Sequence, residues 1–271
     1  MGKSKFRTTE LSNPAFEMDG LRFITIKTPH LKGRGDICVF VPKGEDHQSL
    51  PVVTLLHGVY GSAWVWPFLG NAHGITQRLI DQKKIPPMVL VMPSDGLWGD
   101  GSGYMNHDGK NFEKWIAEDV PDAVFENIPE VSEESIHFIA GLSMGGFGAL
   151  KIGAKYGEKY QAISAHSLIT EVAQMTLFVE EPLDAYKQAE RAREDVLTAI
   201  IENRENLPRL RFDCGLDDEL LDYNRTLHQE LKKNQVPHTY EEFVGSHKWE
   251  YWQEHLEDTL IFFKDVLKKS C

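Results

Sequence analysis

Hydrophobic residues along this chain form two kinds of strand-like run. Residues 22–28 and 35–42 alternate apolar and polar positions and are joined by the turn LKGRG. Alternation with a period of two is typical of strands with one face in solvent, so we expect an antiparallel hairpin here. Five later runs are almost continuously apolar, as expected for strands covered on both faces of a parallel sheet: 51–58, 87–94, 136–143, 160–167 and 209–215. A last run, 238–247, alternates again and is expected near an edge of the sheet.

Helical spacing of apolar residues occurs between these runs, in residues 111–127, 145–155, 219–234 and 248–268. Strands that alternate with helices predict an α/β fold with a mostly parallel central sheet of about eight strands, helices on both faces and the N-terminal antiparallel hairpin. No repeat or linker divides the sequence, so we expect residues 1–271 to form a single domain. Residues 168–206 are longer than one crossover helix requires, which indicates either surface padding or a helical, lid-like insertion over the carboxyl ends of the strands.

Composition and charge narrow the possible partners. The chain is 41% hydrophobic and 26% charged, as globular proteins usually are. A net charge of −12 argues against nucleic acid or an anionic membrane as a partner, because both need basic patches. The N-terminus lacks the apolar core of a signal peptide and no run of about 18 apolar residues occurs. We therefore expect a cytoplasmic protein with a small-molecule partner, and the sequence leaves a homo-oligomer open.

A serine lies where the run 136–143 changes into a helix. The motif Gly141-x-Ser143-x-Gly145 surrounds it with small residues, as a tight strand-to-helix turn requires. Such a turn holds the hydroxyl above the sheet, where N–H groups at the helix N-terminus stabilise developing negative charge. The motif alone arises by chance in many chains, but in this position it predicts that Ser143 is a nucleophile.

A nucleophilic serine needs a base, and the base needs a carboxylate that orients it. Asp217 and Asp218 follow the last fully apolar run, and His247 lies in a Gly-bounded turn after the strand HTYEEFV. His228 falls in helix-like sequence and His238 precedes its strand, so we expect both to be surface residues. We predict His247 as the base and Asp218 as the acid, with Asp217 as the alternative.

Ester chemistry also needs N–H donors for the oxyanion. The N–H of Met144, directly after the serine, is one candidate. The turn HGVYG after the run 51–58 provides the other, from Val59 or, less favourably, Tyr60. His57, at the end of this early strand, is expected to have a structural role.

Five segments occur in the order seen in one known family: LLHGVYGSAWVW, VMPSDG, GLSMGGFGAL, CGLDD and GSHKWEYW. Over roughly residues 20 to 265 the chain resembles the putative-esterase family of α/β-hydrolases, which includes tributyrin-type esterases, S-formylglutathione hydrolase (esterase D), feruloyl and acetylxylan esterases and mycolyltransferase antigens. The resemblance implies the α/β-hydrolase fold, serine esterase activity without a cofactor, and Ser143, Asp218 and His247 as the triad. The chain departs from the family in carrying Lys248 after the histidine and Val59-Tyr60 where Gly-Gly is frequent, which leaves the acyl and alcohol preference open.

The stretch 92–112 is rich in Gly, Asp and aromatic residues and follows a predicted strand, where cleft-lining loops lie in open α/β sheets. We expect substrate contacts from aromatic and imidazole side chains of this stretch and of two neighbouring turns: Tyr60, Trp98, Tyr104, His107 and Trp249. The alternative is a packed loop whose polar groups hold its own backbone. The stretch lacks the spacing and terminal Glu of an EF-hand, so we expect no metal site.

The residues together predict hydrolysis of small acyl or carbohydrate-linked esters through an acyl-enzyme. The first alternative is acyl transfer to a sugar or other alcohol in place of water. The second is a non-catalytic binding protein on a hydrolase scaffold, which the complete set of Ser143, Asp218 and His247 disfavours.

Overall fold

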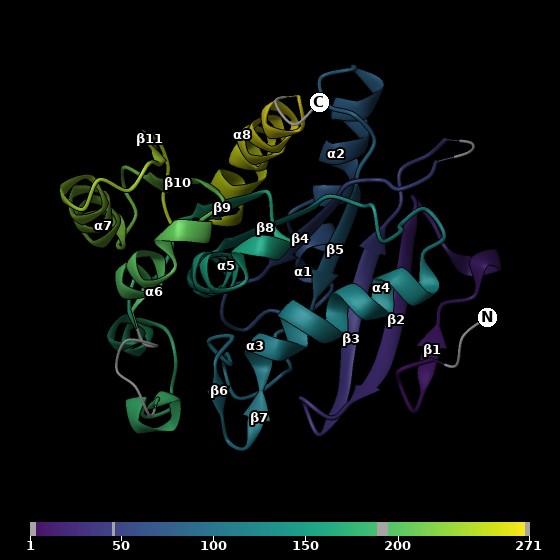
Figure 1. Ribbon diagram of the computed structural model, residues 1–271, viewed down its shortest axis with the longest axis horizontal. Coiled ribbons are helices and arrows are strands. Elements are labelled where there is room, and N and C mark those ends of the chain that lie inside the picture. The colour runs from purple at the N-terminus through teal and green to yellow at the C-terminus, as the bar shows by residue number, and fades with distance from the viewer. Residues whose placement is uncertain (1–3, 45–46, 189–194, 269–271) are drawn as a thin grey trace.

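Figure 1 shows the computed structural model of the protein, which describes residues 4–44, 47–188 and 195–268. Within these ranges, nine strands form one sheet in the order β1-β2-β3-β5-β4-β8-β9-β10-β11, and β6 and β7 form a separate two-stranded ribbon. Strands β5, β4, β8, β9, β10 and β11 run parallel, whereas β1, β2, β3 and β5 pair antiparallel in that order. The strands are β1 (Thr9–Leu11), β2 (Leu21–Thr28), β3 (Gly33–Phe40), β4 (Val52–Leu56), β5 (Val89–Pro93), β6 (Asn106–His107), β7 (Lys110–Asn111), β8 (His137–Leu142), β9 (Ala162–His166), β10 (Arg209–Gly215) and β11 (Thr239–Phe243).

The predicted fold class is confirmed. The N-terminal hairpin consists of β2 and β3, paired from Leu21 opposite Phe40 to Thr28 opposite Gly33. All five continuous apolar runs are interior strands, and β11 lies at an edge of the sheet as its alternating pattern predicted. The strands that the sequence pattern did not indicate are β1, β6 and β7, which are too short to show a period.

Helices cover both faces of the sheet (Figure 1). One face packs against α1 (Val65–Phe68), α2 (Ala72–Asp81) and α8 (Trp249–Leu267). The other packs against α3 (Phe112–Lys114), α4 (Val120–Asn127), α5 (Met144–Lys155), α6 (Val196–Glu202) and α7 (Leu221–Lys233). The sequence of β8 is continuously apolar because both of its faces are buried. Phe138 and Ala140 belong to the core on the side of α1, α2 and α8, and Ile139 belongs to the core on the other side.

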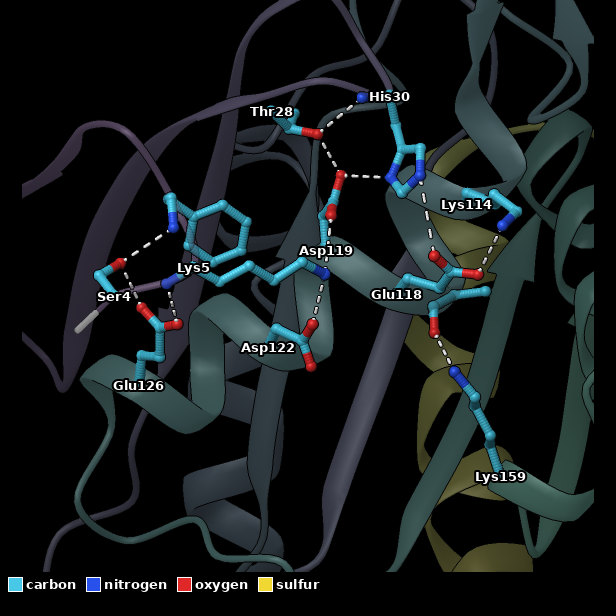
Figure 2. Close-up of polar contacts among 12 residues, drawn as sticks. Ser4, Lys5, Thr28, His30, Lys114, Glu118, Asp119, Asp122, Glu126 and Lys159 are labelled. Carbon is cyan, nitrogen blue, oxygen red and sulfur yellow. Dashed lines mark hydrogen bonds and ion pairs between the residues drawn. The ribbon is translucent and has the colours of Figure 1, made fainter. Parts of the chain in front are cut away.

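The helix predicted over residues 111–127 is divided by one turn of π-helix, Trp115–Asp119, between α3 and α4. Figure 2 shows that this turn directs the fully buried carboxylate of Asp119 toward the β2–β3 hairpin. Asp119 accepts a hydrogen bond from the Thr28 hydroxyl, and its Oδ2 lies 2.8 Å from His30 Nδ1. Its Oδ1 lies 3.2 Å from Lys5 Nζ, so the segment before β1 is also held against this helix.

The segment 168–206 contains less regular helix than its pattern predicted. Apart from α6, its described part forms the short 3₁₀ helices η4 (Val172–Leu177), η5 (Leu183–Tyr186) and η7 (Arg204–Asn206), and residues 189–194 lie outside the described ranges. Helix α6 packs against α5 and α7. No helix within the described ranges is both long and apolar enough to cross a membrane.

Candidate active site

Ser143 stands alone between the end of β8 and the start of α5. Its backbone has φ 53° and ψ −121°, a strained conformation for a residue with a side chain. The neighbouring glycines permit this turn, because a Cβ on Gly141 would lie 2.2 Å from the carbonyl oxygen of Gly145. A Cβ on Gly145 would lie 2.3 Å from the carbonyl oxygen of Leu56. The turn therefore displays the Ser143 hydroxyl at the carboxyl edge of the sheet, as the motif predicted.

Three side chains from three loops form a chain of hydrogen bonds at this edge. His247, after β11, places Nε2 3.0 Å from Ser143 Oγ. Its Nδ1 lies 3.0 Å and 3.2 Å from the two carboxylate oxygens of Asp218, which follows β10. Asp217 is exposed, and its backbone N–H donates to the carbonyl of Gly245. The structure thus brings Asp218, and not Asp217, to the imidazole.

The electrostatic surroundings keep Asp218 ionised. Burial alone would raise the pKa of this carboxyl group, but hydrogen bonding to His247, the charge of that imidazole and the Leu220 N–H outweigh it, so the pKa is lowered. An ionised carboxylate accepts a hydrogen bond from the N–H at His247 Nδ1, which leaves Nε2 as the acceptor that faces Ser143. This arrangement can remove the hydroxyl proton.

The turn after β4 lies directly beside the serine. A Cβ on Gly58 would lie 3.3 Å from Ser143 Cβ, so a side chain there would crowd Ser143. The N–H of Tyr60 is already used, because it donates to the carbonyl of Asp100 at 2.7 Å. Of the two donors considered for this turn, Val59 therefore remains the candidate, together with Met144 at the first position of α5.

His57 has the structural position that was expected of it. Its ring is buried, and its Nε2 accepts the backbone N–H of Asp95 at 3.0 Å. The proton must then be on Nδ1, which donates to the carbonyl of Gly58 at 2.6 Å. Burial lowers the pKa of His57, which favours this neutral form. The two hydrogen bonds of the ring fix the turn that carries Val59.

A buried polar network lies beneath the serine and connects to it through the backbone, because the Ser143 N–H donates to the carbonyl of His166 at 2.9 Å. The carboxylate of Asp213 lies 2.8 Å from His166 Nδ1, and accepts from Arg211 at 2.5 Å and from Tyr251 at 2.7 Å. Burial opposes ionisation of Asp213, but these three neighbours outweigh it and lower its pKa to about 2. A charged group is therefore fixed within the core under the site.

A cleft of about 560 Å³ opens over the Ser143 hydroxyl. Most of its walls are apolar, and the charged side chains of Lys248 and Glu250 lie at its exposed rim. The lining residues are Gly58, Val59, Tyr60, Gly61, Val65, Leu69, Leu142, Ser143, Phe178, His247, Lys248, Trp249, Glu250 and Trp252.

Comparison with known proteins gives the family. Residues 28–263 match the family described as putative esterase. The chain belongs to the putative-esterase family. This esterase is 27% identical over 246 residues to an acetyl esterase of Caldicellulosiruptor saccharolyticus, a match that covers 83% of this chain and 87% of that protein. It is an enzyme that acts on carboxylic esters.

Solved structures share the fold of the esterase. A ferulic acid esterase aligns with a TM-score of 0.78 at 24% identity, over 97% of this chain and 99% of that one. An S-formylglutathione hydrolase from Agrobacterium tumefaciens aligns with a TM-score of 0.78 at 20% identity, with the same coverage of both chains.

The residues expected to contact substrate fall into two groups in the esterase. Tyr60 and Trp249 line the cleft, whereas Trp98, Tyr104 and His107 are not among its lining residues. The Tyr104 hydroxyl bonds both the N–H and the carbonyl of the His57 backbone, each at 3.0 Å. Tyr104 is therefore packed, as in the alternative weighed for the stretch 92–112, but its hydroxyl holds the backbone of His57 and not that of its own loop.

Trp98 and His107 pack against each other edge to face, with ring centroids 4.5 Å apart. The Trp98 indole N–H donates to Asp108, and His107 Nε2 lies 2.8 Å from the carbonyl of Ser102. Both rings also contact Tyr186 edge to face, so they pack against protein outside the cleft.

One cleft residue that the sequence interpretation missed is Phe178, which follows η4. Its ring stacks on the imidazole of His247 with centroids 5.3 Å apart and an angle of 20° between the planes. No periodic pattern marks this position, because the residues around it form a 3₁₀ helix and an irregular turn. Val65 and Leu69 at α1 were missed as well, although the apolar string AWVWPFL around them was a visible signal.

Proposed function

We propose that this esterase hydrolyses small acyl or carbohydrate-linked esters with a Ser143–His247–Asp218 triad, through an acyl-enzyme. The observation that carries the proposal is the continuous set of hydrogen bonds from Asp218 through His247 to Ser143 Oγ. A nucleophile, a base within reach of its proton and a carboxylate that orients the base are the parts that acyl transfer by serine requires.

In the first step, His247 Nε2 removes the hydroxyl proton as Ser143 Oγ forms a bond to the ester carbonyl carbon. The negative charge moves to the carbonyl oxygen, where the N–H groups of Met144 and Val59 stabilise it. Asp218 stabilises the imidazolium without taking its proton. The bond from carbon to the alcohol oxygen then breaks, and His247 returns the proton to the leaving alcohol.

In the second step, water replaces the alcohol. His247 takes a proton from the water as its oxygen bonds to the acyl carbon, and the N–H groups of Met144 and Val59 again hold the oxyanion. The bond between the acyl carbon and Ser143 Oγ breaks, the serine regains its proton from His247, and the carboxylic acid leaves. The cycle consumes one ester and one water and needs no cofactor.

The acetyl esterase relative and the similarity to a ferulic acid esterase support a small or aromatic acyl group. Carbohydrate-linked esters are proposed from the family resemblance. Acyl transfer to an alcohol is the alternative, and an assay with added sugar or alcohol acceptor separates the two, since a transferase would form a new ester faster than free acid.

We also propose that residues 1–271 form a single α/β-hydrolase domain in which residues 168–206 are a lid-like insertion. The stacking of Phe178 on His247 supports this role. Cytoplasmic location stays a prediction from the sequence, which leaves a homo-oligomer open.

The test is Ser143→Ala in the full chain. We expect hydrolysis of p-nitrophenyl acetate to fall to the background rate, a loss of about 10⁶-fold, because the nucleophile is removed. Fluorophosphonate labelling should also disappear, while circular dichroism stays unchanged. Ser132→Ala, in the turn that precedes β8, is the matched control and should keep full turnover. Unchanged activity in folded Ser143→Ala would rule out the proposed triad.

A further inference from the structure

The tripeptide Gly99–Asp100–Gly101 lies between the segment 172–186 and the turn that carries Val59. Asp100 is half-buried and is not among the residues that line the cleft. Asp100 has no role in the proposed mechanism, yet it forms hydrogen bonds to both of these neighbours through its backbone and side chain.

Toward the segment 172–186, the tripeptide makes three hydrogen bonds. The Asp100 N–H donates to Glu181 Oε1 at 3.0 Å, and Asp100 Oδ2 accepts the backbone N–H of Glu180 at 2.9 Å. The Tyr186 hydroxyl donates to the carbonyl of Gly101 at 2.8 Å. Asp100 thus donates to Glu181 and accepts from Glu180, and this pair of hydrogen bonds fixes the two segments in one register.

Gly99 also lies close to the segment 172–186, because its backbone packs against the carboxylate of Glu181. Its φ is +54°, and a Cβ there would lie 2.2 Å from Glu181 Oε1. Any other residue would be strained at this positive φ, and its Cβ would displace the Glu181 carboxylate.

On its other side, the tripeptide touches both candidate oxyanion residues. The Asp100 carbonyl accepts the N–H of Tyr60, which has a left-handed φ of 59°. A Cβ on Gly101 would lie 2.5 Å from Met144 Sδ and 3.3 Å from Val59 Cγ1. A shift of the tripeptide would therefore move the backbone around Val59, and would also disturb the side chain of Met144.

The same segment reaches the base. Phe178, two residues before Glu180, lies on the face of the His247 ring. One short stretch of chain thus contacts the imidazole directly and the oxyanion turn through Asp100.

We propose that Asp100 is a positioning residue, which couples the seating of the segment 172–186 to the geometry of the oxyanion donors. This inference rests on the proposed function, because it assigns Val59 and Met144 to the oxyanion. When Asp100 loses its side-chain acceptor, the segment loses its register, the Tyr60 turn relaxes and the Val59 N–H moves away from the developing charge.

The experiment compares four variants of the full chain. Asp100→Ala removes the acceptor for Glu180 N–H, whereas Asp100→Asn keeps an oxygen there. Glu181→Ala removes the acceptor for Asp100 N–H. Asp184→Ala is the matched control, because it removes an exposed carboxylate from η5 that makes none of these contacts.

Two readouts separate positioning from stability. We expect kcat for p-nitrophenyl acetate to fall about 10-fold in Asp100→Ala and Glu181→Ala, since misplacing a donor costs less than removing it, while KM changes less than about 2-fold. Phenylboronic acid forms a tetrahedral adduct with a catalytic serine, so its Ki should rise in parallel with the loss of kcat. Asp100→Asn and Asp184→Ala should behave as wild type in both measurements.

Several results would overturn the inference: a rise in KM with kcat intact, a loss of kcat without a change in the boronate Ki, or equal defects in Asp100→Ala and Asp100→Asn. If Asp100→Ala does not fold, Glu181→Ala decides by the same criteria. Ser143→Ala is measured alongside. Activity in that variant refutes the triad itself, whereas an inactive Ser143→Ala with wild-type behaviour of both Asp100→Ala and Glu181→Ala refutes only the coupling.

Discussion

Replacing Asp218 by Asn should disable the base through its tautomer while preserving the shape of the site. Asp218 Oδ1 accepts the N–H of Leu220 at 2.8 Å, and its Oδ2 lies 3.0 Å from His247 Nδ1. An asparagine keeps its oxygen toward the Leu220 donor, which places its NH₂ group against the imidazole. His247 Nδ1 then has to accept, so the ring proton moves to Nε2, which faces Ser143 Oγ.

The size of the effect follows from this inversion. Nε2 that carries a proton cannot remove the serine proton, and the productive tautomer would require an N–H facing an NH₂ group. Loss of the correct tautomer in a serine triad costs about 10⁴ in kcat, or about 5 kcal/mol in activation free energy. The KM should stay within about 3-fold, because the cleft walls are unchanged and the lost interaction belongs to the transition state.

The assay is steady-state hydrolysis of p-nitrophenyl acetate near neutral pH, with circular dichroism as a check on the fold. Asp217→Asn is the matched control, because this neighbour carries the same charge, is exposed and should retain full turnover. If folded Asp218→Asn keeps more than about a tenth of wild-type kcat, or if Asp217→Asn is the impaired variant, the tautomer argument is refuted.

Two further predictions concern the buried carboxylates. The pKa of Asp213 is about 2 in the folded protein against a usual 3.8, so its stabilising contribution is complete above the usual value and is lost as the pH falls through 2. Urea unfolding of the wild type should show a loss of about 2 kcal/mol from this group between pH 5 and pH 2, and Asp213→Asn should lack that part of the pH dependence. Asp119→Ala removes the acceptor at the centre of Figure 2 and should lower the free energy of unfolding by about 3 kcal/mol, measured in urea at pH 7. A loss below about 0.5 kcal/mol would contradict the structural role assigned to Asp119.

The local order of the site could be predicted from sequence because each part is encoded by adjacent residues. Gly141-x-Ser143-x-Gly145 follows an apolar run and begins a helix, and a tight turn there needs small neighbours whatever the rest of the chain does. His247 could be distinguished from His228 and His238 by its place after a strand. The last two are half-buried and lie 2.8 Å apart between Nδ1 and Nε2, so the expectation of simple surface residues was only partly met.

Other features had a signal that the interpretation did not use. Helix α2 buries Ala72, Ile75, Thr76 and Leu79, a spacing of i, i+3, i+4 and i+7. Its overall polarity hid that pattern. The two residues Asp217 and Asp218 are chemically identical and adjacent, so only the path of the turn after β10 distinguishes them.

What the sequence by itself determined was the order of the main strands and of the four predicted helical segments, because hydrophobic periodicity and turn residues act over a few neighbours. What only the tertiary structure decided was which surfaces meet across long separations. Tyr104 and His107 had the chemistry of cleft residues, but packing against His57 and Tyr186 turned them into supports for the loop. Phe178 had no distinguishing pattern, yet it lies on the imidazole of His247, because the position of an irregular segment depends on contacts that no local period encodes.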